Sequence, residues 1–308
     1  MQDPGLRRKI IRGLAIATAN NGCGQRRYFR AAGFALSVSN LYRRARGVTV
    51  RRLPRVNYDE IADLYDAQPY RARTADPELL AFAEQRASAD PAVLDIGCGT
   101  GNQLIANRFA LPRARYAGLD RSFGMLRQAR LKGPELAWLR ADGGALPFAE
   151  RSFDFVCCQF AFHHFEDKAG MLRAVLQVLR PGGRFVLRNM CPQESADWLY
   201  YEYFPEARLV DLQDFWPPNA VVEVMEAAGF VMVETDYEYV HFEQNLSAWL
   251  EIVRRRDTCS QLQAISDAAY QAGVERLARE LADPSEAKSR KDHLCLVTIR
   301  GEAPSDGG

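Results

Sequence analysis

The chain of 308 residues carries a formal net charge of +1, and 47% of its residues are hydrophobic. This is the composition of a globular protein, which excludes fibrous and low-complexity classes, and no apolar run approaches the roughly 18 residues that cross a membrane. Seven cysteines without a C-x-x-C pair or regular spacing argue against a disulfide framework, and they predict reduced thiols and a cytoplasmic location.

The charge is unevenly distributed along the chain. Residues 1–55 contain 13 Lys or Arg and one acid, which leaves 27 basic against 38 acidic side chains in the rest. A short helical pattern occurs there at Ile10–Ala17. Three interpretations stay open: a disordered extension, an arm that binds nucleic acid or another anionic surface, and an organelle transit peptide. We expect the folded domain to cover residues 56–301.

Two helices are predicted at the start of this domain. Apolar side chains recur near helical spacing at Tyr58, Ile61 and Tyr65. Pro77 then begins a second helical segment, because proline is well tolerated in the first turn of a helix.

A glycine-rich stretch, VLDIGCGTGN at residues 93–102, follows these helices. The aliphatic run and the amphipathic segment after it predict a strand, a tight turn and a helix. Glycine lets the backbone approach a ligand closely, and the first turn of a helix offers free N–H groups. Asp95 lies just before the first glycine, where a carboxylate would repel a pyrophosphate but suits a cationic ligand.

The stretch resembles motif I, D/E-x-G-x-G-x-G, of the class I S-adenosylmethionine (SAM) dependent methyltransferases. SAM carries an ammonium and a sulfonium, so an acid at this position fits. The resemblance implies that SAM contacts Asp95, Gly97, Cys98, Gly99 and Gly101. The alternative is a glycine turn that only closes an ordinary strand-to-helix connection.

The string YDEIADLYD at residues 58–66 is similar to the N-terminal cap of small-molecule members of this family. In that family an aromatic side chain of the cap closes over SAM. The resemblance implies this role for Tyr65, with Arg71 as a further contact. Core packing and a solvated surface charge are the alternatives for these two residues.

Short apolar runs alternate with helical segments from Ala92 onward. Strands are predicted at Ala92–Ile96, Ala114–Leu119, Leu136–Arg140, Phe153–Gln159 and Arg184–Arg188, and helices at about 102–110, 122–131 and 168–179. This alternation predicts an α/β fold with a mostly parallel, Rossmann-like sheet and helices on both faces. Ligands of such sheets bind at the carboxyl ends of the strands.

Acids follow two of these strands. Asp120 ends the second strand, where its carboxylate could accept hydrogen bonds from both ribose hydroxyls, and the family places an acid there. The resemblance assigns Asp142 to the adenine amino group and the Gly143 backbone to the ring. A charge at a helix start and an Asp-Gly turn are the alternatives. Three more SAM contacts follow from the resemblance: Arg121, Met125 and Gln159.

The stretch FDFVCCQFAFHHF at residues 153–165 resembles the fourth motif of the family. Because histidine titrates near neutral pH, His163 or His164 could accept a proton from the methyl acceptor. The alternative is that these histidines only bond to backbone. Cys157 and Cys158 are adjacent on a strand, so they should point to opposite faces and serve packing.

The second half of the chain completes the expected sheet. The helix and turn around LRPGG (residues 179–183) match the next family signature. A helix at Val221–Gly229 and strands at Phe230–Tyr239 and Leu294–Arg300 would bring the sheet to seven strands. An aromatic segment at about 195–220 and a helical insertion at 243–283 should form a lid, whose aromatics could stack on an acceptor or form a core. Residues 302–308 should be a disordered tail.

These features predict a methyltransferase that transfers the methyl group of SAM to an O, N or C atom of a small molecule by in-line displacement. Since positive charge disappears in this reaction, positioning and water exclusion suffice and a base is optional. The resemblance is greatest to ubiquinone and menaquinone C-methyltransferases, from which the insertion at 243–283 departs.

Two other functions stay open. An RNA or tRNA methyltransferase could use the basic arm, but the body is acidic, and Gln159–Phe162 lacks the Asn-Pro-Pro-aromatic motif of adenine N-methyltransferases. A non-catalytic protein of the same fold could bind a partner instead. No metal site is expected, and the sequence does not fix the oligomeric state.

Overall fold

The computed structural model describes residues 56–67, 71, 73–86, 90–283, 285 and 287–306. The basic segment 1–55, with the helix expected at Ile10–Ala17, lies outside these ranges. No helix of the described part of the chain is long and apolar enough to cross a membrane.

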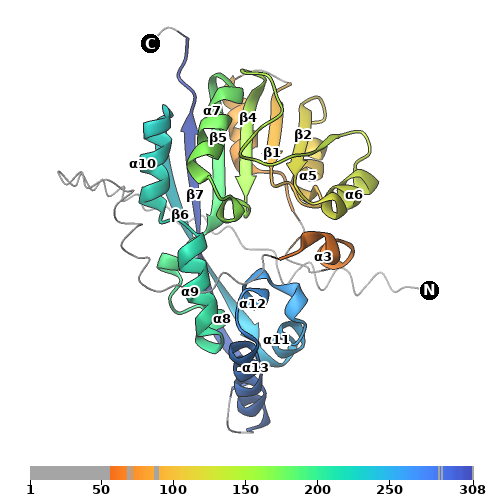
Figure 1. The fold of residues 1–308 in the computed structure, drawn as a ribbon, viewed down its shortest axis with the longest axis vertical. Helices are drawn as coiled ribbons and strands as arrows, with labels where there is room; N and C mark the ends of the chain where they lie inside the picture. The colour runs from red at the N-terminus through yellow and green to blue at the C-terminus, as the bar shows by residue number, and fades with distance from the viewer. Residues whose placement is uncertain are drawn as a thin grey trace, which may run out of the picture. The chain divides into compact units, whose positions relative to one another are not determined.

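The described strands form a seven-stranded sheet in the order β3-β2-β1-β4-β5-β7-β6 (Figure 1). Strands β1 to β5 pair in parallel, whereas β7 runs antiparallel to β5 and β6. The bounds are β1 Ala92–Ile96, β2 Arg115–Asp120, β3 Ala137–Arg140, β4 Phe153–Gln159, β5 Leu179–Met190, β6 Val231–Asn245 and β7 Ser289–Glu302. The predicted fold class is confirmed, and the strand order reverses between β1 and β4, where such sheets bind ligands.

Helices cover both faces of the sheet (Figure 1). One face packs against α4 Pro77–Arg86, α5 Asn102–Ala110 and α6 Phe123–Lys132, and the other against α7 Lys168–Val178 and α10 Pro218–Ala228. The prediction for the adjacent cysteines is confirmed, because Cys157 belongs to the core under α4 to α6 and Cys158 to the core under α7 and α10.

Polar side chains fix where the helices near the site begin. The Ser122 hydroxyl caps α6 by accepting the Met125 N–H at 3.1 Å, and the Asp167 carboxylate caps α7 through the Gly170 N–H at 2.7 Å. Each cap satisfies a backbone donor that has no partner within its own helix. The capping residues lie next to the helices in sequence, so local sequence sets where these helices begin. The predicted starts at about residues 122 and 168 accordingly agree with the structure.

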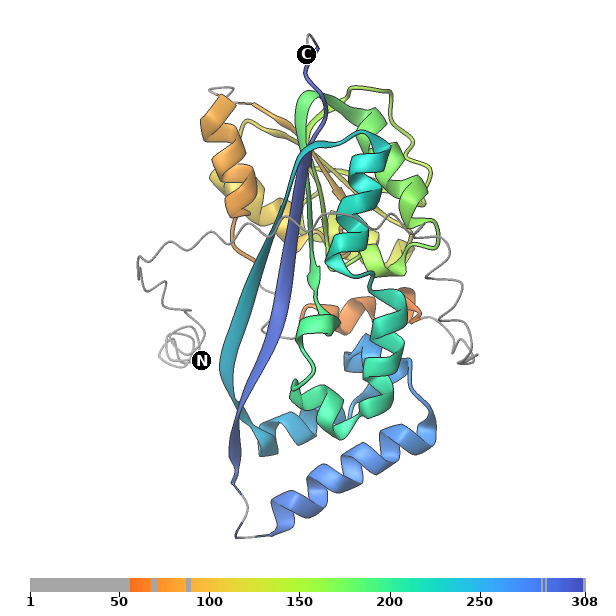
Figure 2. The same cartoon turned by 90° about the vertical axis from the view of Figure 1, so that its left-hand side faces the viewer.

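The last two strands are longer than predicted and form a ribbon that extends beyond the sheet (Figure 2). The helix expected from residue 243 is wrong for its first three residues, because β6 runs to Asn245. Most of β6 is exposed and none of its residues is fully buried, so burial in a core does not mark the far end of this strand. The expected disordered tail also begins too early, since Glu302 ends β7 and buried Ala303 bonds to Gly183 at 2.8 Å.

The far end of the ribbon carries the lid (Figure 2). Its helices enclose a second core of buried aromatics that includes Trp198, Tyr203, Phe204, Trp249 and Tyr270. Of the two roles left open for the lid aromatics, these side chains therefore fit core packing. The lid elements are η4 Pro192–Glu194, α8 Leu199–Tyr203, α9 Pro205–Asp214, α11 Leu246–Val253, η5 Arg256–Thr258, α12 Ser260–Gln263 and α13 Asp267–Ala282.

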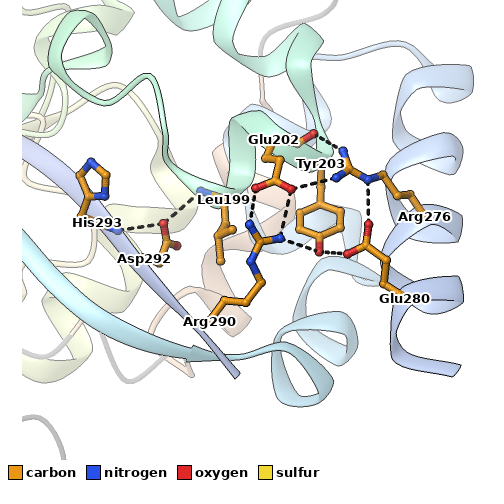
Figure 3. Close-up of polar contacts among 8 residues, drawn as sticks. All are labelled: Leu199, Glu202, Tyr203, Arg276, Glu280, Arg290, Asp292 and His293. Carbon is orange, nitrogen blue, oxygen red and sulfur yellow. Dashed lines mark hydrogen bonds and ion pairs between the residues drawn. The ribbon is translucent and has the colours of Figure 1, made fainter. Parts of the chain in front are cut away.

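A polar network fastens α8 to α13 and to the ribbon (Figure 3). The Glu202 carboxylate pairs with Arg276 of α13 at 2.8 Å and with Arg290 of β7 at 2.7 Å. Arg276 also pairs with Glu280 at 2.9 Å, and the carboxylate of buried Asp292 accepts the Leu199 N–H at 3.0 Å. These contacts cross-link the helices of the lid to the strand that carries them.

Candidate functional site

The glycine loop after β1 lies at the point where the strand order reverses. The Gly97 N–H donates to the Leu119 carbonyl at 2.7 Å, which fastens the loop to the end of β2. Gly97 and Gly101 have φ of 75° and 79°. A Cβ at Gly97 would lie 2.4 Å from the Ala161 side chain, and one at Gly101 would lie 2.4 Å from the Trp138 ring. The packing of the protein itself therefore requires glycine at both positions.

Gly99 differs from its two neighbours in the motif. Its φ of 54° lies in the left-handed region, yet an added Cβ would meet no atom of the described residues within 4 Å. Open space therefore lies in front of this backbone. A ligand held against bare backbone would occupy that space, which is the role the sequence predicted for the loop.

The Asp120 carboxylate stands at the edge of this space. One of its oxygens accepts the Gly99 N–H and the other accepts the Ser122 N–H, each at 2.9 Å. Burial raises the pKa of Asp120, and these two backbone bonds act in the opposite direction. An ionised carboxylate has about four lone-pair sites, so Asp120 keeps acceptor capacity for a hydroxyl of a ligand.

Asp95 is almost fully buried at the end of β1. Burial raises the pKa of Asp95 to about 7, while a hydrogen bond with the Cys157 thiol and the charge of Arg73 act in the opposite direction. A cation placed beside this carboxyl would favour its ionised form. The predicted contact of Asp95 with a positively charged ligand stays a prediction.

Two functional candidates next to Asp95 were missed in the sequence. Asp76, just before α4, is buried and accepts a hydrogen bond from Gln159 of β4 at 2.8 Å. The Arg73 guanidinium lies 5.6 Å from the centre of the Phe160 ring, and burial lowers the pKa of Arg73. The only signal in the sequence is that three charged residues, Arg71, Arg73 and Asp76, precede the helix. Charged residues are equally common in exposed loops, so this signal does not indicate a site.

The backbone is strained where β4 ends. Phe160 has a φ of 54°, which is unusual for a residue with a side chain. Its N–H donates to the Arg188 carbonyl at 2.8 Å, so β5 holds the strained residue in place. Strain of this kind is concentrated at functional sites, and it lets the chain turn from Gln159 toward the histidines.

The short helix α3, Tyr58–Tyr65, is tied by its carboxylates to both sides of the glycine loop. Asp59 accepts the Ser122 hydroxyl at 2.7 Å and the Gly124 N–H at 2.6 Å. Asp66 accepts the Thr100 hydroxyl at 2.6 Å. These bonds fasten α3 to the glycine loop and to the start of α6, and its role as a cap over SAM stays a prediction.

The two predicted cap residues bond to each other. The Arg71 guanidinium donates to the Tyr65 hydroxyl at 2.6 Å, and the Arg71 carbonyl accepts the Asn102 side chain of α5 at 3.1 Å. Both residues are thereby brought to the glycine loop, and a direct contact with SAM stays a prediction.

The histidine pair lies in η3, Phe162–His164, after β4. The Tyr58 hydroxyl and the His164 Nε2 share a hydrogen bond of 2.9 Å. His163 stacks on the Phe215 ring of the lid, with ring centres 4.0 Å apart. Burial and the neighbouring His164 hold the pKa of His163 well below its usual range. The structure therefore separates two histidines that the sequence could not tell apart.

The remaining residues predicted to contact SAM differ in how far they are exposed to solvent. Met125 and Cys98 are buried, and Arg121 is exposed. The exposed Asp142 carboxylate accepts the Gly144 N–H at 2.8 Å, as in an ordinary Asp-Gly turn. At Gly143 a Cβ would lie 2.3 Å from the Phe165 ring, so packing requires glycine there. Their contacts with SAM stay predictions.

Comparisons with known proteins agree with this geometry. Residues 94–187 match a family described as "Methyltransferase domain". Demethylmenaquinone methyltransferase of Thermus thermophilus is 31% identical over 165 residues, which cover 45% of this chain and 73% of the relative. The enzyme of that name from Chlorobaculum tepidum is 32% identical over 154 residues, covering 47% of this chain and 63% of that enzyme. The chain thus spans less than two thirds of the second relative.

Two further matches cover more of the chain. Trans-aconitate 2-methyltransferase of an Azoarcus species is 28% identical over 271 residues, covering 73% of this chain and 98% of the relative. The solved structure of phosphoethanolamine N-methyltransferase 2 from Haemonchus contortus, in complex with SAM, shares the fold with a TM-score of 0.51. That match is 19% identical and covers 80% of this chain and 57% of the other.

Proposed function

Because the chain belongs to the class I SAM-dependent methyltransferases, we propose that it transfers the methyl group of SAM to a small-molecule acceptor. The observation that carries this proposal is the open space against the Gly99 backbone, with the Asp120 carboxylate at its edge. Direct calorimetric binding of SAM to the full chain tests it. Absence of binding would overturn the proposal.

The residues around the crevice fit SAM part by part. Asp120 would bind the ribose hydroxyls through its remaining lone pairs. Asp95 would face the ammonium of the amino-acid end, and Arg73, whose charge acts on Asp95, would bind the carboxylate of that end. Asp142 and Gly143 would face adenine. When bound, SAM supplies an electrophilic methyl group on a sulfonium.

Positioning is the main contribution expected of the protein. Methyl transfer is an in-line displacement in which charge is neutralised, so alignment of the acceptor and exclusion of water lower the barrier. The helix α3 covers the glycine loop through Asp59 and Asp66. The lid contacts the histidine pair through Phe215. Together they would close the reacting end off from water.

The pair of Tyr58 and His164 is the candidate proton acceptor. Their hydrogen bond orients the His164 ring, and a neutral imidazole has one ring nitrogen without a proton, so the pair could accept one proton. Burial raises the pKa of Tyr58, so its hydroxyl stays neutral. His163, with its lowered pKa and its stack on Phe215, would position the loop instead.

Replacing His164 by alanine is expected to lower kcat about tenfold and to change SAM affinity less than twofold. The low end of the range for acid-base catalysis applies, because displacement at a sulfonium does not require a base. Turnover with labelled SAM and calorimetric SAM binding would be measured side by side. His241→Ala is the matched control, since His241 is exposed on β6. A normal kcat for His164→Ala would leave His164 with a structural role.

Binding of S-adenosylhomocysteine is expected to become about fivefold tighter between pH 6 and pH 7.5. The pKa of Asp95 is about 7, so this carboxyl is mostly protonated at pH 6, whereas a bound ammonium favours the ionised form. Calorimetry of the wild type and Asp95→Asn would measure the effect, which the variant should lack. Asp211→Asn is the control, because the pKa of this buried lid carboxyl is also about 7. Loss of the pH dependence in the control alone would contradict the assignment.

A screen would identify the acceptor. The named relatives act on demethylmenaquinone and on trans-aconitate, which are chemically unlike, so the resemblance does not choose an acceptor for this chain. Incubating the full chain with methyl-labelled SAM and a metabolite extract would reveal the labelled product. Mixed tRNA in a parallel reaction would test the nucleic-acid alternative.

A further inference from the structure

Arg208 of the lid helix α9 is a cation with no counter-charge in the described ranges of the chain. It is half-buried, and its Nε is buried without a hydrogen-bond partner. Within the described part of the chain, no ion pair joins its guanidinium to a carboxylate. A buried donor without a partner costs free energy, so a group that accepts its hydrogen bonds would bind there favourably.

The acid one turn further along the helix is occupied by other groups. Asp211 lies three residues further along α9, at a spacing that often forms ion pairs. Its carboxyl instead accepts the Tyr201 hydroxyl at 2.8 Å and bonds to Gln261 of α12. Burial raises the pKa of Asp211 to about 7, which lowers its average charge near neutrality. Asp211 therefore does not neutralise the positive charge of Arg208.

The position of Arg208 on α9 relates it to the reacting end of the site. Phe215 caps the C-terminus of α9 seven residues beyond Arg208, so the Cα atoms of the two residues lie about two turns apart along one side of the helix. Seven residues of helix span about 10 Å. Phe215 stacks on His163, and His163 lies beside the His164 that bonds to Tyr58. One face of α9 thus presents an aromatic ring next to the histidines and a cation about two turns away.

We propose that Arg208 binds an anionic group of the methyl acceptor, a carboxylate or a phosphate, while the opposite end of the acceptor lies against His163 and Phe215. This inference rests on the proposed function and adds the class of acceptor to it. Guanidinium binds either anion through paired N–H donors, which gives orientation as well as affinity. An elongated acceptor held at its charged end would present its other end to the methyl donor.

The first experiment sorts acceptors by charge. A metabolite extract separated by anion exchange into anionic and non-anionic fractions would be incubated with the full chain and methyl-labelled SAM. Label should enter the anionic fraction at least tenfold more than the other. If the anion is a phosphate, phosphatase treatment of that fraction should abolish labelling. If the anion is a carboxylate, amidation of the carboxylates should abolish it. Label confined to the non-anionic fraction would overturn the proposal.

The second experiment tests Arg208 itself. At a limiting amount of the anionic fraction, Arg208→Met should transfer label about tenfold more slowly than wild type, with the difference shrinking as the fraction is concentrated. Arg208→Lys should recover part of the rate, because it restores the charge without the paired donors. Arg279→Met is the matched control, since Arg279 of α13 is exposed. A rate for Arg208→Met equal to that of the control would overturn the proposal.

SAM binding separates this proposal from the one on which it rests. Arg208→Met should bind SAM with wild-type affinity in calorimetry, which also shows that the variant is folded. If the wild type binds SAM and methylates only uncharged molecules, the proposal for Arg208 fails and the methyltransferase function stands. If the wild type does not bind SAM, the function fails first and the proposal for Arg208 with it.

Discussion

Replacing Gly99 by alanine is expected to weaken SAM binding by about a hundredfold while the protein remains folded. The new methyl group would meet no atom of the described residues within 4 Å and would project into the space assigned to SAM. A hundredfold loss corresponds to about 2.7 kcal/mol. The φ of 54° adds about 1–2 kcal/mol of backbone strain, which lowers stability without preventing folding. Calorimetry with SAM and thermal unfolding would measure the two effects separately.

Gly182→Ala provides the matched control for the strain. Gly182 has a φ of 68°, and its N–H bonds to the Ala303 carbonyl at 2.9 Å, at the other end of the sheet. An added Cβ would meet only the mobile ends of side chains there, at Arg86 and Ser305. This variant should lose similar stability and keep SAM binding. Equal SAM affinity in Gly99→Ala and Gly182→Ala would place SAM elsewhere and contradict the assignment.

The second large effect is expected for Asp120→Ala, which should weaken SAM binding at least thirtyfold. The change removes two hydrogen bonds to a charged acceptor, each contributing about 1.5–3 kcal/mol, and thirtyfold corresponds to about 2 kcal/mol. The measurement is calorimetric SAM binding. Asp63→Ala is the control, because the Asp63 carboxylate of α3 is exposed and pairs with Arg127.

A direct role of Asp120 must be separated from its support of the loop, since its carboxylate also holds the N–H groups of Gly99 and Ser122. The 2′-deoxy analogue of S-adenosylhomocysteine makes this distinction. The wild type should bind the analogue more weakly than the parent compound, whereas Asp120→Ala should bind the two equally. If both proteins discriminate to the same extent, Asp120 supports the loop and does not contact the ribose.

The sequence predicted the bounds of a strand or helix correctly where the signals for that element lie within the element itself. The strands at Ala92–Ile96 and Phe153–Gln159 and the helix at residues 102–110 coincide with the structure, because their apolar patterns and flanking glycines are local signals. The ribbon of β6 and β7 was predicted too short, because its far end has no such local signal. Most of β6 is solvent-exposed and is defined by its pairing with β7, a partner distant in sequence.

The sequence by itself determined the glycine loop and the strand-end acids that we propose hold the cofactor. Glycines at 97, 99 and 101 and acids at 95 and 120 are fixed by backbone conformation and by the ends of adjacent parallel strands. Such features depend on neighbours along the chain, so they can be read from spacing.

Only the tertiary structure brought together the side chains that we propose for the acceptor half. Tyr58 meets His164 across 106 residues, Asp76 meets Gln159 across 83, and Phe215 reaches His163 from the lid. Among the residues that the structure describes, Arg208 has no counter-charge, because Asp211 bonds to a tyrosine from another helix. These relations come from how separate elements pack, and packing forces contacts that no local pattern of residues encodes.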